Sequence, residues 1–137
     1  LYSINAIGVL LDDQGRPDEA EPYYREALET RRRVLGAEHP DTLDSINNLG
    51  LLLWDQGRLS EAEAYMREAM ESRRRVLGAE HPDTLSSVGS LGVLIKAQGR
   101  LSEAEAFYRQ ALEGRRRVLG HDHRETRFSS ISRGPRL

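Results

Sequence analysis

The chain has 137 residues, of which 38% are hydrophobic, and its 20 Lys and Arg residues nearly balance its 22 Asp and Glu residues, for a net charge of −2. Such an even balance provides no general attraction for nucleic acid or for an anionic membrane, so neither is expected as a partner. The absence of cysteine excludes disulfides and thiolate metal sites and fits a reducing, cytoplasmic location.

A period of 42 residues organises the sequence. Residues 31–43 read RRRVLGAEHPDTL, the same letters return at residues 73–85, and residues 31–72 match residues 73–114 at 29 of 42 positions. Repetition at a fixed period indicates stacked structural units. We therefore divide the chain into repeats at residues 1–36, 37–78 and 79–120, and interpret residues 121–137 as the degenerate start of a fourth repeat or a tail. Because the sequence starts at Leu1 and not at Met, we expect it to be part of a longer protein.

Two helices are predicted in each repeat, because apolar residues recur at the i, i+3, i+4, i+7 spacing of a half-buried helix. In the second repeat, the stripe expected to be buried on the first helix is Leu43, Ile46, Leu49, Gly50 and Leu53. In chain order, we expect helices from the start of the chain to Gly15, Asp18 to Gly36, Pro40 to Gly57, Ser60 to Gly78, Pro82 to Gly99, and Ser102 to Gly120. The predicted fold class is all-α.

The ends of these helices carry recurring signals. The first helices are expected to stop at glycines that adopt positive φ, namely Gly15, Gly57 and Gly99. The second helices are expected to open with capping boxes, formed by Asp18 and Glu21, Ser60 and Glu63, and Ser102 and Glu105. Pro40 and Pro82 suit the first turn of the next helix, and the adjacent His39 and His81 are expected to serve packing or capping.

The alternation of small and large residues in these helices resembles the tetratricopeptide repeat. The matching residues are Gly8, Ala20, Tyr24 and Ala27, then Leu49, Gly50, Leu53, Ala62, Met66 and Ala69, and finally Gly92, Ala104, Tyr108 and Ala111. The 42-residue period and the LGAEHPDT connector are similar to the variant found in kinesin light chains. The resemblance implies a right-handed α-α superhelix, a solenoid of three antiparallel helix pairs, with the first helices lining its inner wall.

Beside the buried stripe of each first helix lies a second stripe, which we expect to line the groove of the superhelix. We call it the groove stripe; its residues are Asn5, Val9, Asp12, Asp44, Asn47, Asn48, Leu51, Trp54, Ser86, Ser90 and Val93. The resemblance implies that Asn5 and Asn47 hydrogen-bond the backbone of an extended peptide, although Gly89 departs from this pattern and an asparagine can also be merely solvated. Trp54, the only tryptophan, is either an anchor for a ligand side chain or half-buried packing.

Three arginine triplets end the second helices, at residues 31–33, 73–75 and 115–117. Clustered cations suit phosphate contacts, but glutamates one turn back, such as Glu68 and Glu71, can pair with them, so a solvated helix end is favoured over nucleic-acid binding. The resemblance implies that the first arginine of each triplet, at Arg31, Arg73 and Arg115, faces carboxylates of a bound partner.

No catalytic site is predicted. The sequence lacks a cysteine nucleophile, a Gly-x-Ser-x-Gly elbow and a phosphate-cradling glycine loop. The histidines of the HDH stretch at residues 121–123 are a weak metal signal because no further ligands lie nearby in the sequence, so neither a metal nor a cofactor is expected.

The function predicted from the sequence is a non-catalytic scaffold that binds an extended peptide or protein segment in its concave groove. The alternative is a structural solenoid that self-associates into end-to-end oligomers, because an array without polar capping helices exposes apolar surface at its ends. At the C-terminal end, Phe128 and Ile131 would have to fold over that surface to cover it.

Overall fold

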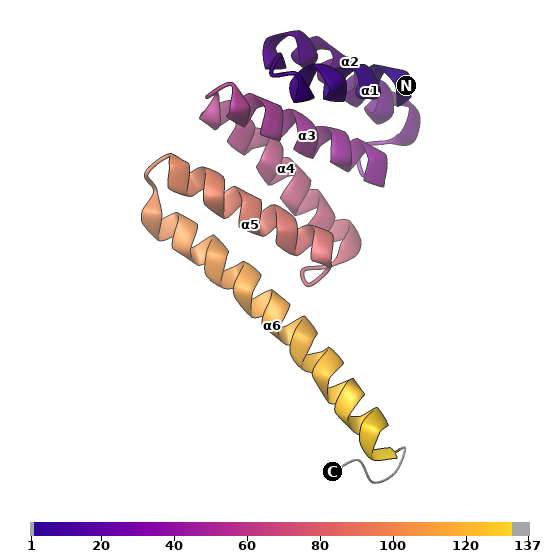
Figure 1. Cartoon of the computed structure of the whole chain (residues 1–137), viewed down its shortest axis with the longest axis vertical. Helices are drawn as coiled ribbons and strands as arrows, with labels where there is room; N and C mark the ends of the chain where they lie inside the picture. Colours follow the sequence, from indigo (N-terminus) through magenta and orange to yellow (C-terminus); the bar gives the residue numbers. More distant parts are fainter. Residues whose placement is uncertain (1, 133–137) are drawn as a thin grey trace.

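A computed structural model describes the backbone of residues 2–132 and the side chains of residues 4–120. Over this part of the chain it forms six helices and no strand: α1 (Tyr2–Asp13), α2 (Pro17–Leu35), α3 (Pro40–Asp55), α4 (Leu59–Leu77), α5 (Pro82–Ala97) and α6 (Leu101–Ser132). The helices stack as three successive pairs, with α1 and α2 at one end and α5 and α6 at the other (Figure 1). The all-α solenoid expected from the sequence is confirmed.

One hydrophobic core runs through all three pairs. Each helix packs on the next helix of the chain, so the first helix of a pair also contacts the second helix of the preceding pair. The core cluster extends from Tyr24 on α2, through the fully buried Leu49 and Leu53 on α3, to Ala111 on α6. The predicted stripe of α3 is therefore buried, and each pair completes the core of its neighbour.

The predicted start signals of α3 and α5 are confirmed. α3 begins at Pro40, and the Nδ1 atom of the preceding His39 accepts a hydrogen bond from the backbone N–H of Asp41 at 3.1 Å. His81 repeats this cap at the start of α5, at 3.0 Å from the N–H of Asp83. Positive φ angles mark the connectors at Gly15, Gly36, Gly57, Gly78 and Gly99.

The predicted capping boxes are wrong. α4 begins at Leu59, so Ser60 already lies inside the helix, and the N-cap residue, Arg58, makes no side-chain cap hydrogen bond. The tight turn explains the early start, because the Arg58 N–H donates to the Leu53 carbonyl at 2.9 Å and leads the chain directly into the next helix. The expected capping positions of the other two second helices likewise lie inside their helices, at Asp18 in α2 and Ser102 in α6.

The predicted end of the last second helix at Gly120 is also wrong. α6 runs without a break from Leu101 to Ser132 (Figure 1). Arg124 occupies the position at which Pro40 and Pro82 begin the earlier first helices, so this segment lacks the ring that ends a preceding helix. The side chains of Phe128 and Ile131, which were expected to cover this end, lie outside the described residues. The repeat boundaries at residues 36, 78 and 120 stay a prediction.

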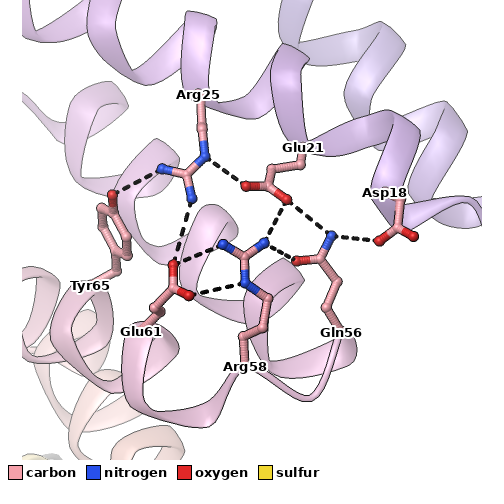
Figure 2. A network of polar contacts seen from close by, with 7 residues as sticks. All are labelled: Asp18, Glu21, Arg25, Gln56, Arg58, Glu61 and Tyr65. Atoms are coloured by element: carbon pink, nitrogen blue, oxygen red, sulfur yellow. Dashed lines mark hydrogen bonds and ion pairs between the residues drawn. The ribbon is translucent and has the colours of Figure 1, made fainter.

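Polar side chains join the first pair to the second at the turn between α3 and α4, in what we call the inter-repeat network (Figure 2). Glu21 on α2 accepts hydrogen bonds from Arg25 Nε at 2.8 Å and from Arg58 Nη1 at 2.7 Å. Gln56 Nε2 donates to the same carboxylate at 3.2 Å. Arg25 also donates to the hydroxyl of Tyr65 on α4, at 3.2 Å. The network therefore connects α2 both to the turn between α3 and α4 and to α4 itself.

The inter-repeat network recurs one period later. Glu63 accepts hydrogen bonds from Arg67 Nε at 2.8 Å and from Arg100 Nη1 at 2.6 Å. Phe107 takes the place of Tyr65, and the guanidinium carbon of Arg67 lies 5.5 Å from its ring centroid. The 42-residue spacing of these residues was visible in the sequence, but the capping-box interpretation assigned Glu63 to its own helix end.

The network lowers the pKa of its two central carboxylates. Burial would raise the pKa of Glu21, but the hydrogen bonds from Arg25, Gln56 and Arg58 outweigh burial and bring the pKa below its ordinary value of 4.5. Burial would also raise the pKa of Glu63, but hydrogen bonds from the equivalent residues Arg67, Gln98 and Arg100 lower it. A carboxylate with a lowered folded pKa stabilises the fold above its unfolded pKa, and this contribution disappears as the pH falls through the folded pKa.

We predict opposite effects for alanine at two glycines of the first helices. A Cβ at Gly50 would lie 2.8 Å from Met66 Cγ in the core, whereas the nearest atom to a Cβ at Gly89 is Arg115 Nη2 at 3.8 Å. Overpacking should make Gly50→Ala lower the free energy of unfolding by about 1–3 kcal/mol. Helix propensity should make Gly89→Ala raise it by about 0.5–1 kcal/mol. Urea denaturation followed by circular dichroism measures both, and shifts of the same sign would contradict the packing described.

We also predict that acid stability depends on the inter-repeat network. The double variant Glu21→Gln, Glu63→Gln should be less stable at pH 7 by about 1–2 kcal/mol per site, because each change removes charge-assisted hydrogen bonds. As the pH falls below 4.5, the wild-type chain should lose this advantage and the two stability curves should converge. Glu105→Gln, which removes the exposed pair with Arg109, is the matched control. Curves that stay parallel through this pH range would contradict the prediction.

Candidate functional site

The groove stripe lies on α1, α3 and α5, beside the buried stripe of each helix. Its half-buried members are Asn5, Asp12, Asn47, Asn48, Trp54 and Ser90, and its exposed members are Val9, Asp44, Leu51, Ser86 and Val93. The stripe is therefore partly accessible on all three first helices. That it lines a concave wall and holds a peptide stays a prediction.

Trp54 is half-buried and packs against the core cluster, so part of its ring contributes to folding and part remains in contact with solvent. At the equivalent positions of the groove stripe, the first repeat carries Asp12 and the third carries Lys96. The three repeats thus place an acid, an aromatic ring and a base along one line of the surface. The side-chain charge at this position therefore changes from negative to neutral to positive along the three repeats.

Carboxylates gather where α1 and α3 end. The pKa of Asp12 is raised by its burial and then by the negative charges of Asp55 and Asp13. The same three carboxylates, after burial, contribute to raising the pKa of Tyr24 to about 12. Because helix C-termini carry a partial negative charge as well, this part of the molecule favours a cationic group.

At the other end of the stripe, a groove forms between α5 and α6. It has a volume of about 430 Å³, and its lining comprises Ser86, Gly89, Ser90, Val93, Tyr108, Ala111, Leu112 and Arg115. The structure therefore brings three predicted residues, Ser86, Ser90 and Val93, together with the first arginine of the last triplet. In the preceding pair, the positions equivalent to Tyr108 and Leu112 are covered by α5.

Asn5 differs from the other asparagines of the stripe. Its Oδ1 atom is out of contact with water and accepts no hydrogen bond from the described part of the chain. A buried acceptor without a donor costs about 1–3 kcal/mol.

Arg31 and Arg73 link successive repeats. Arg31 is only 9% exposed, and its Nη1 atom donates to Ser45 Oγ at 2.8 Å and to the Asp41 carbonyl at 3.1 Å. Arg73 makes the equivalent bond to Ser87 Oγ at 2.8 Å. Both guanidinium groups thus join the end of one repeat to the first helix of the next. Their predicted contact with a partner's carboxylate stays a prediction.

Arg73 also reaches the groove stripe. Its Nη2 atom lies 2.9 Å from Asp44 Oδ1, so the guanidinium bridges α3 and α5 through Asp44 and Ser87. Because Asp44 is exposed, a carboxylate from a partner could take its place beside Arg73 without uncovering the core.

Three further triplet arginines, Arg32, Arg75 and Arg117, pair with acids outside their own helix and not with glutamates one turn back in it. Arg32 bonds to Glu68 of the following repeat at 2.6 Å, so the expected pairing of Glu68 within its own helix is wrong. Arg75 pairs with Glu38, and Arg117 pairs with Glu80. Glu38 and Glu80 lie in the connectors that follow α2 and α4, so Arg75 and Arg117 each reach back to the connector that precedes their own helix pair. These pairs reduce the cationic charge offered to nucleic acid, whose exclusion as a partner stays a prediction.

Neither a metal cluster nor a membrane span is found in the described residues. No group of three His, Asp or Glu side chains lies close enough there to hold a metal ion. None of the described helices combines the length and the apolar character needed to cross a membrane. The side chains of the HDH stretch at residues 121–123 lie outside the described residues.

Comparison with solved structures finds the same kind of stack. BtubC (BKLC) from P. vanneervenii is similar with a TM-score of 0.78 and 26% identity, over 83% of this chain and 45% of that one. The nearly identical TPR-like repeats of a putative kinesin light chain from Podosopora anserina give 0.76 and 23%, over 86% of this chain and 56% of that one. The TPR domain of Arabidopsis FLU gives 0.71 and 20%, over 82% of this chain and 91% of that one.

The last two similarities show the fold alone, and this chain spans about half the length of the first two structures. No curated protein sequence matches the chain. A sequence profile of the tetratricopeptide repeat matches residues 1–74 and again residues 46–117. The matched segments overlap and together cover most of the sequence, so the chain belongs to the tetratricopeptide repeat family, as its period and its alternating small and large residues predicted.

Proposed function

We propose that the chain is a non-catalytic protein-interaction module that holds an extended segment of a partner protein against its groove stripe. Tetratricopeptide repeats generally mediate contacts between proteins. The observation that carries the proposal is that different side chains serve folding and remain accessible to a partner. The buried stripes and the inter-repeat network hold the stack together, whereas the groove stripe remains partly accessible on all three first helices.

The chemistry of the groove stripe supports an extended peptide as the ligand. Asn47 and Asn48 each carry an amide that both donates and accepts, which suits the alternating N–H and C=O groups of a peptide backbone. The accessible part of the Trp54 ring offers an apolar or cation–π contact. The carboxylate of Asp12 belongs to the same stripe, and that of Asp55 lies close enough to raise the pKa of Asp12. We therefore expect a partner segment with an apolar side chain next to a Lys or Arg.

The titratable groups support binding over catalysis. Burial and nearby carboxylates raise the pKa of Tyr24 to about 12, which keeps its phenol protonated and unsuited to act as a base near neutral pH. The lowered pKa values of Glu21 and Glu63 come from the ion pairs that join repeats. These shifts follow from structural contacts of the stack.

The proposal predicts that Asn47 and Trp54 together determine affinity. The probe is a phage-displayed library of random linear peptides, from which binders to the wild-type chain are selected and synthesised. Because the chain contains one tryptophan, its fluorescence emission reports directly on occupation of the groove stripe near Trp54. The double variant Asn47→Ala, Trp54→Phe lacks this fluorophore, so its affinity and that of the wild type are compared by fluorescence anisotropy of the labelled peptides. It should bind them at least about tenfold more weakly, as expected for loss of an anchor residue.

The control for this prediction is Val76→Ala, which truncates an exposed apolar side chain on α4 outside the groove stripe. Circular dichroism checks that both variants keep the helix content of the wild type. Selected peptides should also be enriched in Lys or Arg beside an apolar residue. Unchanged affinity of the double variant, or selected peptides that leave Trp54 emission unchanged, would overturn the assignment of the groove.

A further inference from the structure

The last helix pair exposes a surface that the other two pairs bury. Tyr108 and Leu112 on α6 are 37% and 49% exposed. Their equivalents one period earlier, Met66 and Met70, are 1% and 3% exposed on α4, which packs on α5. The equivalents two periods earlier, Tyr24 and Leu28, are both 5% exposed on α2, which packs on α3. The molecule itself therefore shows twice what covers such a surface: the first helix of another repeat of the same type.

The first helix pair exposes the complementary surface. Ile7 and Leu10 on α1 are 43% and 56% exposed, whereas their equivalents on α3, Leu49 and Leu52, are buried against the preceding pair. We call Ile7, Leu10, Gln14 and Arg16 the N-terminal face, and Glu105, Tyr108, Leu112 and Arg115 the C-terminal face. Each face consists of the residues that the 42-residue register assigns to one side of an inter-repeat contact.

The charges of the two faces match as well. Arg16 and Gln14 are the equivalents of Arg58 and Gln56, which donate to Glu21 at the first junction. On the C-terminal face, Glu105 is the equivalent of Glu21, and it already pairs with Arg109 at 2.7 Å as Glu21 pairs with Arg25. The N-terminal face thus supplies the donors, and the C-terminal face supplies the acceptor.

We propose that the N-terminal face of one copy of the chain docks on the C-terminal face of a second copy, with α1 of one molecule lying along α6 of the other as α3 lies along α2. The occupant is a second copy because α1 carries both the exposed apolar pair and the Arg-Gln donors that the covered junctions use. Arg16 of one copy then bonds to Glu105 of the other, and Leu10 packs near Tyr108 and Leu112.

The shape of α6 permits this contact. α6 continues straight past the beginning of α5 and does not fold back along residues 101–119 (Figure 1). The flank that carries Tyr108 and Leu112 therefore stays open. The contact is heterologous, because two different faces meet, and it leaves one face of each kind unused in a dimer. The groove stripes of successive copies would join end to end, which goes beyond the proposed binding of one peptide to one chain.

A mixing experiment tests the proposal. Sedimentation velocity of the wild-type chain from about 10 μM to about 1 mM, the range of weak protein contacts, should show concentration-dependent association. Leu10→Glu and Leu112→Glu should each be monomeric over the same range, because each buries an unpaired charge at the junction. An equal mixture of the two variants should form dimers and nothing larger, since only one intact junction can form between them.

Val76→Glu is the matched control, because Val76 is an exposed apolar side chain that stays 46% exposed in the middle of the stack and so lies on neither face. It should associate as the wild type does. Circular dichroism confirms folding, and both tested leucines are already exposed, so the changes leave the core intact. A wild-type chain that stays monomeric at the highest concentration, or a mixture that fails to dimerise while the wild type associates, would overturn the proposal.

A charge exchange tests the polar half of the junction. Arg16→Glu and Glu105→Arg should each weaken association about tenfold, because each places like charges opposite one another. The double variant Arg16→Glu, Glu105→Arg should recover most of the loss. Equal association by all four proteins would show that these two residues do not meet. None of these changes touches Asn47 or Trp54, so the result is independent of peptide binding.

Discussion

The burial of each second helix beneath the first helix of the following repeat is the contact on which the rest of the structure depends. A single helix pair leaves such side chains partly uncovered, as Tyr108 and Leu112 are in the last pair, whereas Tyr24 and Leu28 are buried where α3 packs on α2. Because every repeat must present the same two surfaces, the sequence repeats the connector, the caps and the buried stripes every 42 residues. The groove stripe is the part of each first helix that this requirement leaves unconstrained. Its residues differ from repeat to repeat for that reason.

The inter-repeat network fixes the distance and the angle at which successive repeats make this apolar contact. Its carboxylates are 19% and 15% exposed at Glu21 and Glu63, and each receives bonds from two arginines. Partly buried, multiply bonded pairs of this kind define distance and angle better than an apolar surface does, since leucine and methionine contacts tolerate sliding. The buried Arg31–Ser45 bond and the Arg73–Ser87 bond repeat the same principle at the other end of the second helices.

Much of this architecture could be predicted from the sequence, and the failures share a cause. Periodicity identified the buried stripe of α3, the helix starts at Pro40 and Pro82, and the capping role of His39, because these depend on residues close together in the chain. The capping boxes and the arginine pairs were wrong because the same local rules were applied to side chains that act between repeats. Glu63 lies three residues from Ser60 but bonds to Arg100, and Glu68 bonds to Arg32. The helical pattern was enough to predict that positions such as Asn47 are partly accessible. It could not predict their ligand, because the ligand is a separate molecule.

The stack also has a mechanical property that follows from its contacts. Each helix packs on its sequence neighbours, and among the described residues the first and last helix pairs share no packed surface. Tension applied between the ends would therefore pass through every inter-helix contact in series, and the weakest contact would open first while the others kept their side chains in place. Such a chain behaves as a compliant spring, in contrast to a globule whose termini meet in one common core.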